Sequence, residues 1–114
     1  MAGLKLVVLY PRPTNIETFE RLYQQEHVPL AAKKLVGATK FIATRVLDVP
    51  RGMTPPFHRI AEIYFPSKEA FEACVGSEGG KETLDHAMKI STGGPPVLLL
   101  TEEDTIPLAQ TAKS

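Results

Sequence analysis

One helical segment carries the residue best suited to acid–base chemistry. Residues 19–30 read FERLYQQEHVPL and place Phe19, Tyr23, His27 and Leu30 at helical spacing. At about 100° per residue these side chains share one stripe of a helix, so the imidazole of His27 faces an otherwise apolar interior. Because the ordinary pKa of histidine is close to neutrality, His27 can act as a general acid or base. The alternative is a neutral core histidine bonded to a backbone carbonyl that Pro29 leaves free.

Two tyrosines are placed to assist that histidine. Tyr23 precedes His27 by one helical turn, so the two side chains can touch. Tyr10 ends a short apolar run and would lie at the mouth of a pocket between helix and sheet. Either phenol could orient a substrate oxygen or stabilise an enolate, and either could instead be a core residue. We expect His27, Tyr23 and Tyr10 to be catalytic, with Phe19 and Leu30 lying against the substrate.

A second polar group falls on the segment 57–65. His58, Glu62 and Tyr64 alternate along it, and the two-residue period of a β-strand would place them on one face. A substrate-binding face would explain His58 and Tyr64, and a solvated or interface face would explain them equally well. Glu26 follows a different geometry, because it lies about 100° around the helix from His27. We expect Glu26 to be exposed rather than bonded to that imidazole.

Metal and cofactor chemistry find little support. The three histidines (His27, His58 and His86) lack ligand spacing such as H-x₃-H, so we expect no metal site. The single cysteine, Cys74, lies on an apolar helical face and cannot form an internal disulfide. We expect no bound cofactor, although a haem with His27 as its axial ligand remains an alternative.

The composition is that of an ordinary single-domain protein. The chain has 114 residues, of which 43% are hydrophobic, and 13 Lys and Arg balance 13 Asp and Glu. This zero net charge argues against nucleic acid and anionic membranes as partners. The N-terminal apolar run is too short for a signal peptide, and no stretch approaches the roughly 20 apolar residues that span a bilayer. With its lone cysteine, the chain is expected to be cytoplasmic.

The elements that position these residues alternate between two periodicities. We predict strands over residues 4–10, 38–49, 57–65 and 97–101, and helices over residues 15–34, 67–76 and 81–90, with a kink or restart at Pro29. The order β-α-β-β-α-β is that of a ferredoxin-like α+β fold, a four-stranded antiparallel sheet with helices on one face. We assign residues 1–103 to one domain and residues 104–114 to a C-terminal tail.

The face of the sheet away from the helices is predicted to be apolar. The first strand presents Leu4, Leu6, Val8 and Tyr10 on one side and Val7 and Leu9 on the other, so either side would be apolar. The last strand is apolar on both sides at Leu98, Leu99 and Leu100. A sheet covered on one side normally shows polar residues on the other. A second copy of the chain could bury this face, so we expect a homodimer formed sheet to sheet. The alternative is a monomer with an apolar surface.

The chain resembles the EthD-like family of the dimeric α+β barrel superfamily. The resemblance covers most of residues 4–101 and rests on Tyr10-Pro11, the aromatic helix face with EHVPL at 26–30, Gly37, AEIYF at 61–65 and Asp85. It implies a homodimer and a pocket between sheet and helices. It also implies a role for Asp85, a recurring acid of the family, which we expect to bind substrate. Families on this fold include monooxygenases without a cofactor, polyketide cyclases, lactone isomerases, dehydratases and haem-binding enzymes. EthD-like proteins themselves are found beside systems that degrade ethyl tert-butyl ether.

These features predict an enzyme that performs cofactor-independent proton transfer on a hydrophobic oxygenated small molecule. Isomerisation, cyclisation and dehydration are the reactions that a histidine and a phenol can support. A non-enzymatic ligand-binding or accessory protein of a degradation pathway would use the same pocket. A monooxygenase or haem-binding enzyme is the second alternative.

Overall fold

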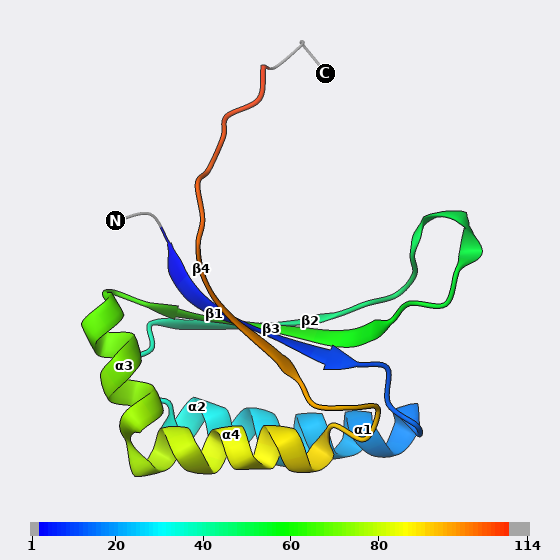
Figure 1. The fold of residues 1–114 in the computed structure, drawn as a ribbon, viewed down its shortest axis with the longest axis horizontal. Helices are drawn as coiled ribbons and strands as arrows, with labels where there is room; N and C mark the ends of the chain where they lie inside the picture. The colour runs from blue at the N-terminus through cyan, green and yellow to red at the C-terminus, as the bar shows by residue number, and fades with distance from the viewer. Residues whose placement is uncertain (1–2, 110–114) are drawn as a thin grey trace.

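The computed structural model describes residues 3–109 and has the predicted β-α-β-β-α-β order. Strand β1 (Leu4–Pro11) leads into a long helix made of α1 (Ile16–Leu22), a π-helical turn (Tyr23–His27) and α2 (Val28–Lys34). Strands β2 (Lys40–Arg45) and β3 (Phe57–Phe65) flank a loop that holds a 3₁₀ turn (Pro50–Gly52). Helices α3 (Lys68–Gly76) and α4 (Glu78–Ile90) then precede β4 (Val97–Glu102). Figure 1 shows the helices on one side of the sheet.

The sheet has the strand order β2-β3-β1-β4, and every neighbouring pair is antiparallel. Along the central strand β1 the side chains of Leu4, Leu6, Val8 and Tyr10 are buried, while the residues between them are only half-buried. This alternation directs one face of the sheet toward the helices. Fully burying an aliphatic side chain contributes about 1.5–3 kcal/mol, so this face supplies much of the stability of the fold.

The long first helix contains the irregularity predicted near Pro29. The N–H of Val28 bonds to the carbonyl of Tyr23, five residues back, which makes residues 23–27 one turn of π-helix. Proline has no N–H and its ring crowds the carbonyl four residues earlier, so a widened turn before Pro29 accommodates it. Beyond this turn the buried stripe passes from His27 to Ala31, and Leu30 is only half-buried.

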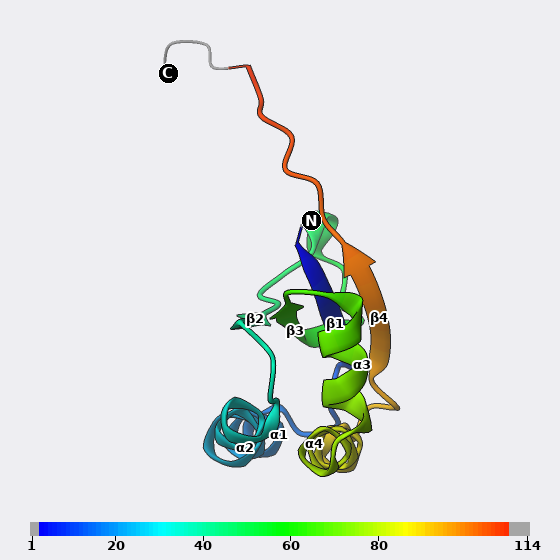
Figure 2. The same cartoon turned by 90° about the vertical axis from the view of Figure 1, so that its left-hand side faces the viewer.

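Two glycines bring α4 close to its neighbours. A Cβ on Gly80 would lie 2.0 Å from the carbonyl oxygen of Cys74, and one on Gly79 would lie 2.6 Å from the carbonyl oxygen of Lys34. Both distances are too short for any side chain, so glycine is required by close approach. Ser77 caps α4 by accepting a hydrogen bond from the N–H of Gly80 at 3.0 Å, and the helix begins at Glu78 rather than at residue 81 as predicted. Figure 2 shows α4 running beside α2 as a result.

The second face of the sheet carries no helix, as Figures 1 and 2 show. On this face Lys5 bonds to Glu62 at 2.6 Å. The edge strand β4 is apolar instead, and residues 97–100 are each 39–46% exposed. Residues 104–109 leave the sheet without forming a helix or strand, and residues 110–114 of the predicted tail lie outside the described residues. Across residues 3–109, no helix is long and apolar enough to cross a membrane.

Candidate functional site

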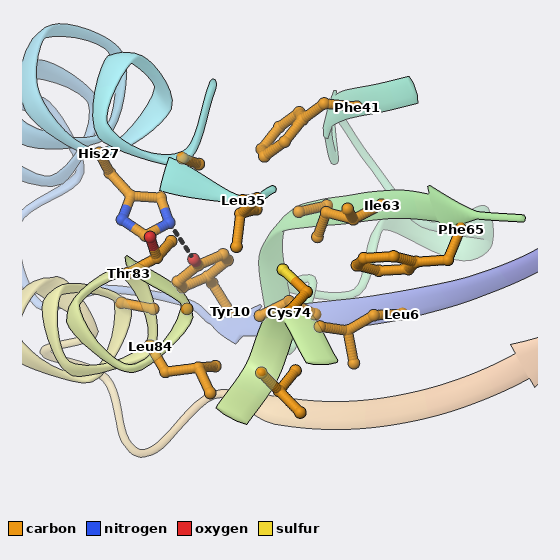
Figure 3. Close-up of a pocket in the computed structure, with 16 residues that line it drawn as sticks. Leu6, Tyr10, His27, Leu35, Phe41, Ile63, Phe65, Cys74, Thr83 and Leu84 are labelled. Atoms are coloured by element: carbon orange, nitrogen blue, oxygen red, sulfur yellow. Dashed lines mark hydrogen bonds between the residues drawn. The ribbon is translucent and has the colours of Figure 1, made fainter. Parts of the chain in front are cut away.

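A small apolar cavity lies between the helices and the buried face of the sheet. Its walls come from β1, β2, β3, α2, α3 and α4, and its volume is about 30 Å³, room for roughly two water molecules. Most lining side chains are aliphatic or aromatic, and several are small (Ala31, Ala61, Cys74, Gly80 and Ala87). Tyr10 and His27 supply the titratable groups at one end of the cavity (Figure 3).

Tyr10 and His27 are joined by a buried hydrogen bond. The hydroxyl of Tyr10 lies 3.1 Å from Nε2 of His27, as the dashed line in Figure 3 marks. The contact joins the end of β1 to the end of the π-helical turn, two elements that the sequence leaves 17 residues apart. The predicted pairing of an imidazole and a phenol at the pocket is therefore present, with Tyr10 as the phenol.

The other nitrogen of His27 contacts a residue that sequence reasoning did not select. Nδ1 of His27 lies 2.9 Å from Nδ1 of His86 on α4, and the two rings are nearly parallel, at 7°, with centroids 5.2 Å apart. Nε2 of His86 lies 3.4 Å from a carboxylate oxygen of Glu26. As predicted, Glu26 is exposed and does not bond to His27.

Burial keeps this part of the molecule uncharged. Desolvation, together with the nearby His86, lowers the pKa of His27 to about 4. Desolvation raises the pKa of the Tyr10 phenol well above its ordinary value, and the neighbouring Tyr23 raises it further. Both groups are therefore neutral at pH 7, and His27 has a free-base imidazole able to accept a proton.

Tyr23 supports the imidazole instead of lining the cavity. Its ring stacks against His27 at a centroid distance of 5.6 Å, and Tyr10 meets Tyr23 edge-on at 5.5 Å. Its buried hydroxyl has no hydrogen-bond partner among residues 3–109, and desolvation raises its pKa to about 12. Phe19 is likewise buried, and it packs on Tyr10 and Tyr23 without reaching the cavity.

A second polar cluster lies about two helical turns before His27. Glu20 accepts two hydrogen bonds from Arg59, at 2.9 and 2.7 Å, and its carboxylate lies 2.8 Å from Nε2 of His58. These bonds, above all those from Arg59, lower the pKa of Glu20 to about 2. The predicted grouping of His58 with Glu62 and Tyr64 is thus wrong. A β-bulge pairs Tyr10 with Arg59 but the next residue, Pro11, with Phe57, so His58 is the extra residue and turns toward α1.

The remaining predicted residues lie away from the cavity. Tyr64 stands on the open face of the sheet beside Lys5, and Lys40 lies over its ring at 4.3 Å. Asp85 is exposed, because the buried stripe of α4 is Gly80, Thr83, Ala87 and Ile90. His86 borders this stripe at three residues from Thr83 and four from Ile90, so the helical period could have placed it near the interior. Its contact with His27 depends on how α4 packs on the first helix, which periodicity does not predict.

The residues around His27 are poorly arranged to hold a metal ion or a haem. In the part of the chain that the structure describes, no group of three or more His, Cys, Asp or Glu residues is arranged to hold a metal ion. Both ring nitrogens of His27 already have partners, and the cavity of about 30 Å³ is far smaller than a porphyrin. These residues do not fit a haem.

The architecture is that of a small ferredoxin-like α+β domain with an apolar cavity between its sheet and helices. Residues 12–89 match the EthD domain family, and the chain belongs to that family. An uncharacterized 11.0 kDa protein from the thcB-thcC intergenic region of Rhodococcus erythropolis is 30% identical over 104 residues, which cover 90% of this chain and 98% of that protein.

Solved structures share the fold, among them proteins from Bacillus halodurans and Jannaschia sp. CCS1. An ethyl tert-butyl ether D (EthD) family protein from Bacillus halodurans is 28% identical, with a TM-score of 0.82 over 90% of this chain and 99% of the other. A protein of unknown function from Jannaschia sp. CCS1, described as dimeric and ferredoxin-like, is 14% identical, with a TM-score of 0.65 over 89% of this chain and all of the other.

Proposed function

We propose that this protein is an enzyme that moves a proton on a hydrophobic oxygenated small molecule, in an isomerisation, cyclisation or dehydration. The observation that carries the proposal is the Tyr10–His27 hydrogen bond at the end of an apolar cavity. His27 is the general base or acid, and the Tyr10 hydroxyl, which is hydrogen-bonded to it, contacts the substrate oxygen and relays the proton between substrate and imidazole. A positioned acid–base group of this kind contributes typically 10²–10⁴-fold to a rate.

The substrate would enter from a neighbouring hollow. A more open depression of about 230 Å³ lies beside the cavity and shares Ala31, Leu35, Phe41 and Ile63 with it. Because the inner cavity holds little more than water, an organic molecule would have to displace side chains of this shared wall. Leu35 and Phe41 are half-buried and belong to the end of the helix and to β2, so we propose that they move to admit it.

We also propose that two copies associate through the open face of the sheet. The apolar edge strand β4 and the uncovered face support this arrangement, and the fold occurs in a protein described as dimeric. The lone cysteine, Cys74, is free and buried, which supports a cytoplasmic location. Sedimentation equilibrium would test the assembly, and replacing Leu99 by lysine should convert a dimer into a monomer.

The activity is tested with a His27→Gln variant and a panel of lactones, enols and phenols. Turnover of a substrate that the wild type converts should fall by about 10²–10⁴-fold, while circular dichroism and assembly stay unchanged. A folded variant that keeps full turnover would refute the proposal. Binding without turnover in the wild type would favour a carrier or accessory protein, and oxygen uptake with a phenol would favour a monooxygenase.

A further inference from the structure

Four side chains form an unbroken line from the cavity to the surface. Tyr10 contacts His27, His27 contacts His86, and His86 contacts Glu26, at 3.1, 2.9 and 3.4 Å. Tyr10 and His27 are 1% and 4% exposed, whereas the side chains of His86 and Glu26 are 18% and 57% exposed. The line therefore begins in a dry interior and ends in water.

When both imidazoles are neutral, the carboxylate at the outer end of this line fixes the direction of every hydrogen bond in it. A carboxylate can only accept, so Nε2 of His86 must donate to Glu26. In a neutral imidazole the other nitrogen then accepts, and Nδ1 of His86 receives the proton that Nδ1 of His27 carries. This leaves Nε2 of His27 as an acceptor, and the Tyr10 hydroxyl donates to it. With His86 neutral, the reverse direction would leave Nε2 of His86 without a proton, facing an oxygen that cannot supply one.

We propose that His86 and Glu26 are the outlet of a proton path, and that they hold His27 in the tautomer with hydrogen on Nδ1. The path rests on the proposed function, because it serves the proton that the substrate releases. That proton passes to the Tyr10 oxygen while the Tyr10 proton passes to Nε2 of His27. The Nδ1 proton of His27 moves to Nδ1 of His86, and the Nε2 proton of His86 moves to Glu26 or to water.

The transfer balances without a buried charge on either ring. After the transfer both imidazoles are neutral, with hydrogen on Nε2 of His27 and on Nδ1 of His86. When Glu26 takes the last proton it becomes neutral, and the substrate carries the negative charge. This suits His27, for which burial disfavours the charged form. Because His86 acts through His27, it is a positioning residue, and its loss should disturb the tautomer of His27 before it disturbs the fold.

The local backbone supports this arrangement. The π-helical turn carries Glu26 on its outer side and His27 on its inner side, so both reach His86 from one segment. The glycine contacts of α4 with Cys74 and Lys34 bring the helix close enough for the contact between His27 and His86. Turns of this kind occur frequently at functional sites.

The first test is a long-range ¹H–¹⁵N NMR spectrum of the full-length wild type at pH 7. We expect hydrogen on Nδ1 of His27 and on Nε2 of His86, with the other two nitrogens unprotonated. Hydrogen on Nε2 of His27 would overturn the proposal whatever the enzyme does. The predicted tautomers in a protein that converts no substrate would leave the hydrogen-bond line and the His27 tautomer standing, but would refute the proposed function and the proton path that rests on it.

Two variants of His86 then separate its role in holding the His27 tautomer from its role in passing the proton outward. In His86→Asn the amide oxygen can accept the Nδ1 hydrogen bond of His27, so the His27 tautomer should persist. Turnover should still fall about ten- to a hundredfold, because an amide cannot pass the proton outward. In His86→Phe both the His27 tautomer preference and the turnover should be lost. Glu72→Gln, an exposed carboxylate change on α3, should alter neither. Full turnover in a folded His86→Phe variant would show that no proton leaves through His86.

Discussion

The two polar clusters on the first helix use similar residues for opposite purposes. Glu20 is held by hydrogen bonds from Arg59 and His58, and the positive charge of Arg59 above all stabilises its ionised form. Among residues 3–109, His27 contacts a phenol and a second imidazole but no opposite charge, and burial favours its neutral form. Only His27 borders the cavity, because Glu20, His58 and Arg59 contribute nothing to its lining. Burial alone therefore does not make a site reactive. The carboxylate of Glu20 is held in an ion pair with Arg59, whereas the neutral imidazole of His27 can still accept a proton.

The largest effect on stability should come from breaking the Glu20 cluster. In Arg59→Met the carboxylate of Glu20 keeps its burial but loses its bidentate partner, so the free energy of unfolding should fall by about 3 kcal/mol. Urea denaturation at pH 7 measures this change. The double variant Glu20→Gln with Arg59→Met should recover part of the loss, because no uncompensated charge remains. A loss below about 0.5 kcal/mol would place the pair among weak surface ion pairs.

Acid should weaken the two clusters in separate pH windows. The pKa of His27 falls from an ordinary 6.5 to about 4 on folding, so the unfolded chain binds the proton first and stability declines as pH drops from about 6.5 to 4. The pKa of Glu20 falls from about 4.5 to about 2, so its contribution is present above pH 4.5 and is lost between there and 2. The shift of His27 corresponds to about 3 kcal/mol.

The two windows can be separated by mutation. Urea midpoints measured from pH 7 to pH 3 should decline early in the wild type, and His27→Gln should remove that early decline while it keeps the later one. If the early decline survives in His27→Gln, another group is responsible for it and His27 is not held neutral by the fold.

The sequence predicted the fold well because strand alternation and helical periodicity are local patterns. The stripe of Phe19, Tyr23 and His27 and the end of β1 at Tyr10 sufficed to place an imidazole and a phenol near each other. Strand β2 proved shorter than predicted, at Lys40–Arg45, because regular pairing with β3 stops where the bulge begins. Strand alternation also misplaced His58, since one extra residue moves a side chain to the other face.

The rest of the site could not be predicted because it depends on contacts between distant segments. His86 meets His27 across 59 residues, and Glu20 meets Arg59 across 39. No local pattern predicts how closely α4 packs on the first helix. That packing depends on Gly79 and Gly80, which in the sequence are equally consistent with a turn that interrupts the helix. Asp85 and Leu30 show the converse error, because each is one residue away from the position that faces inward.

The smallest effect should come from the residue between the two clusters. Tyr23 stacks on His27 on one side and lies 4.9 Å from the guanidinium of Arg59 on the other, but its buried hydroxyl has no partner among the described residues. Because an unbonded buried hydroxyl is a cost, Tyr23→Phe should change the free energy of unfolding by less than about 1 kcal/mol and in the stabilising direction. Turnover should stay within twofold of the wild type, whereas Tyr10→Phe should lose activity because it removes the donor to His27. A tenfold loss of turnover in Tyr23→Phe would instead show that the Tyr23 hydroxyl reaches the substrate. Tyr23 would then belong to the reactive cluster with Tyr10 and His27.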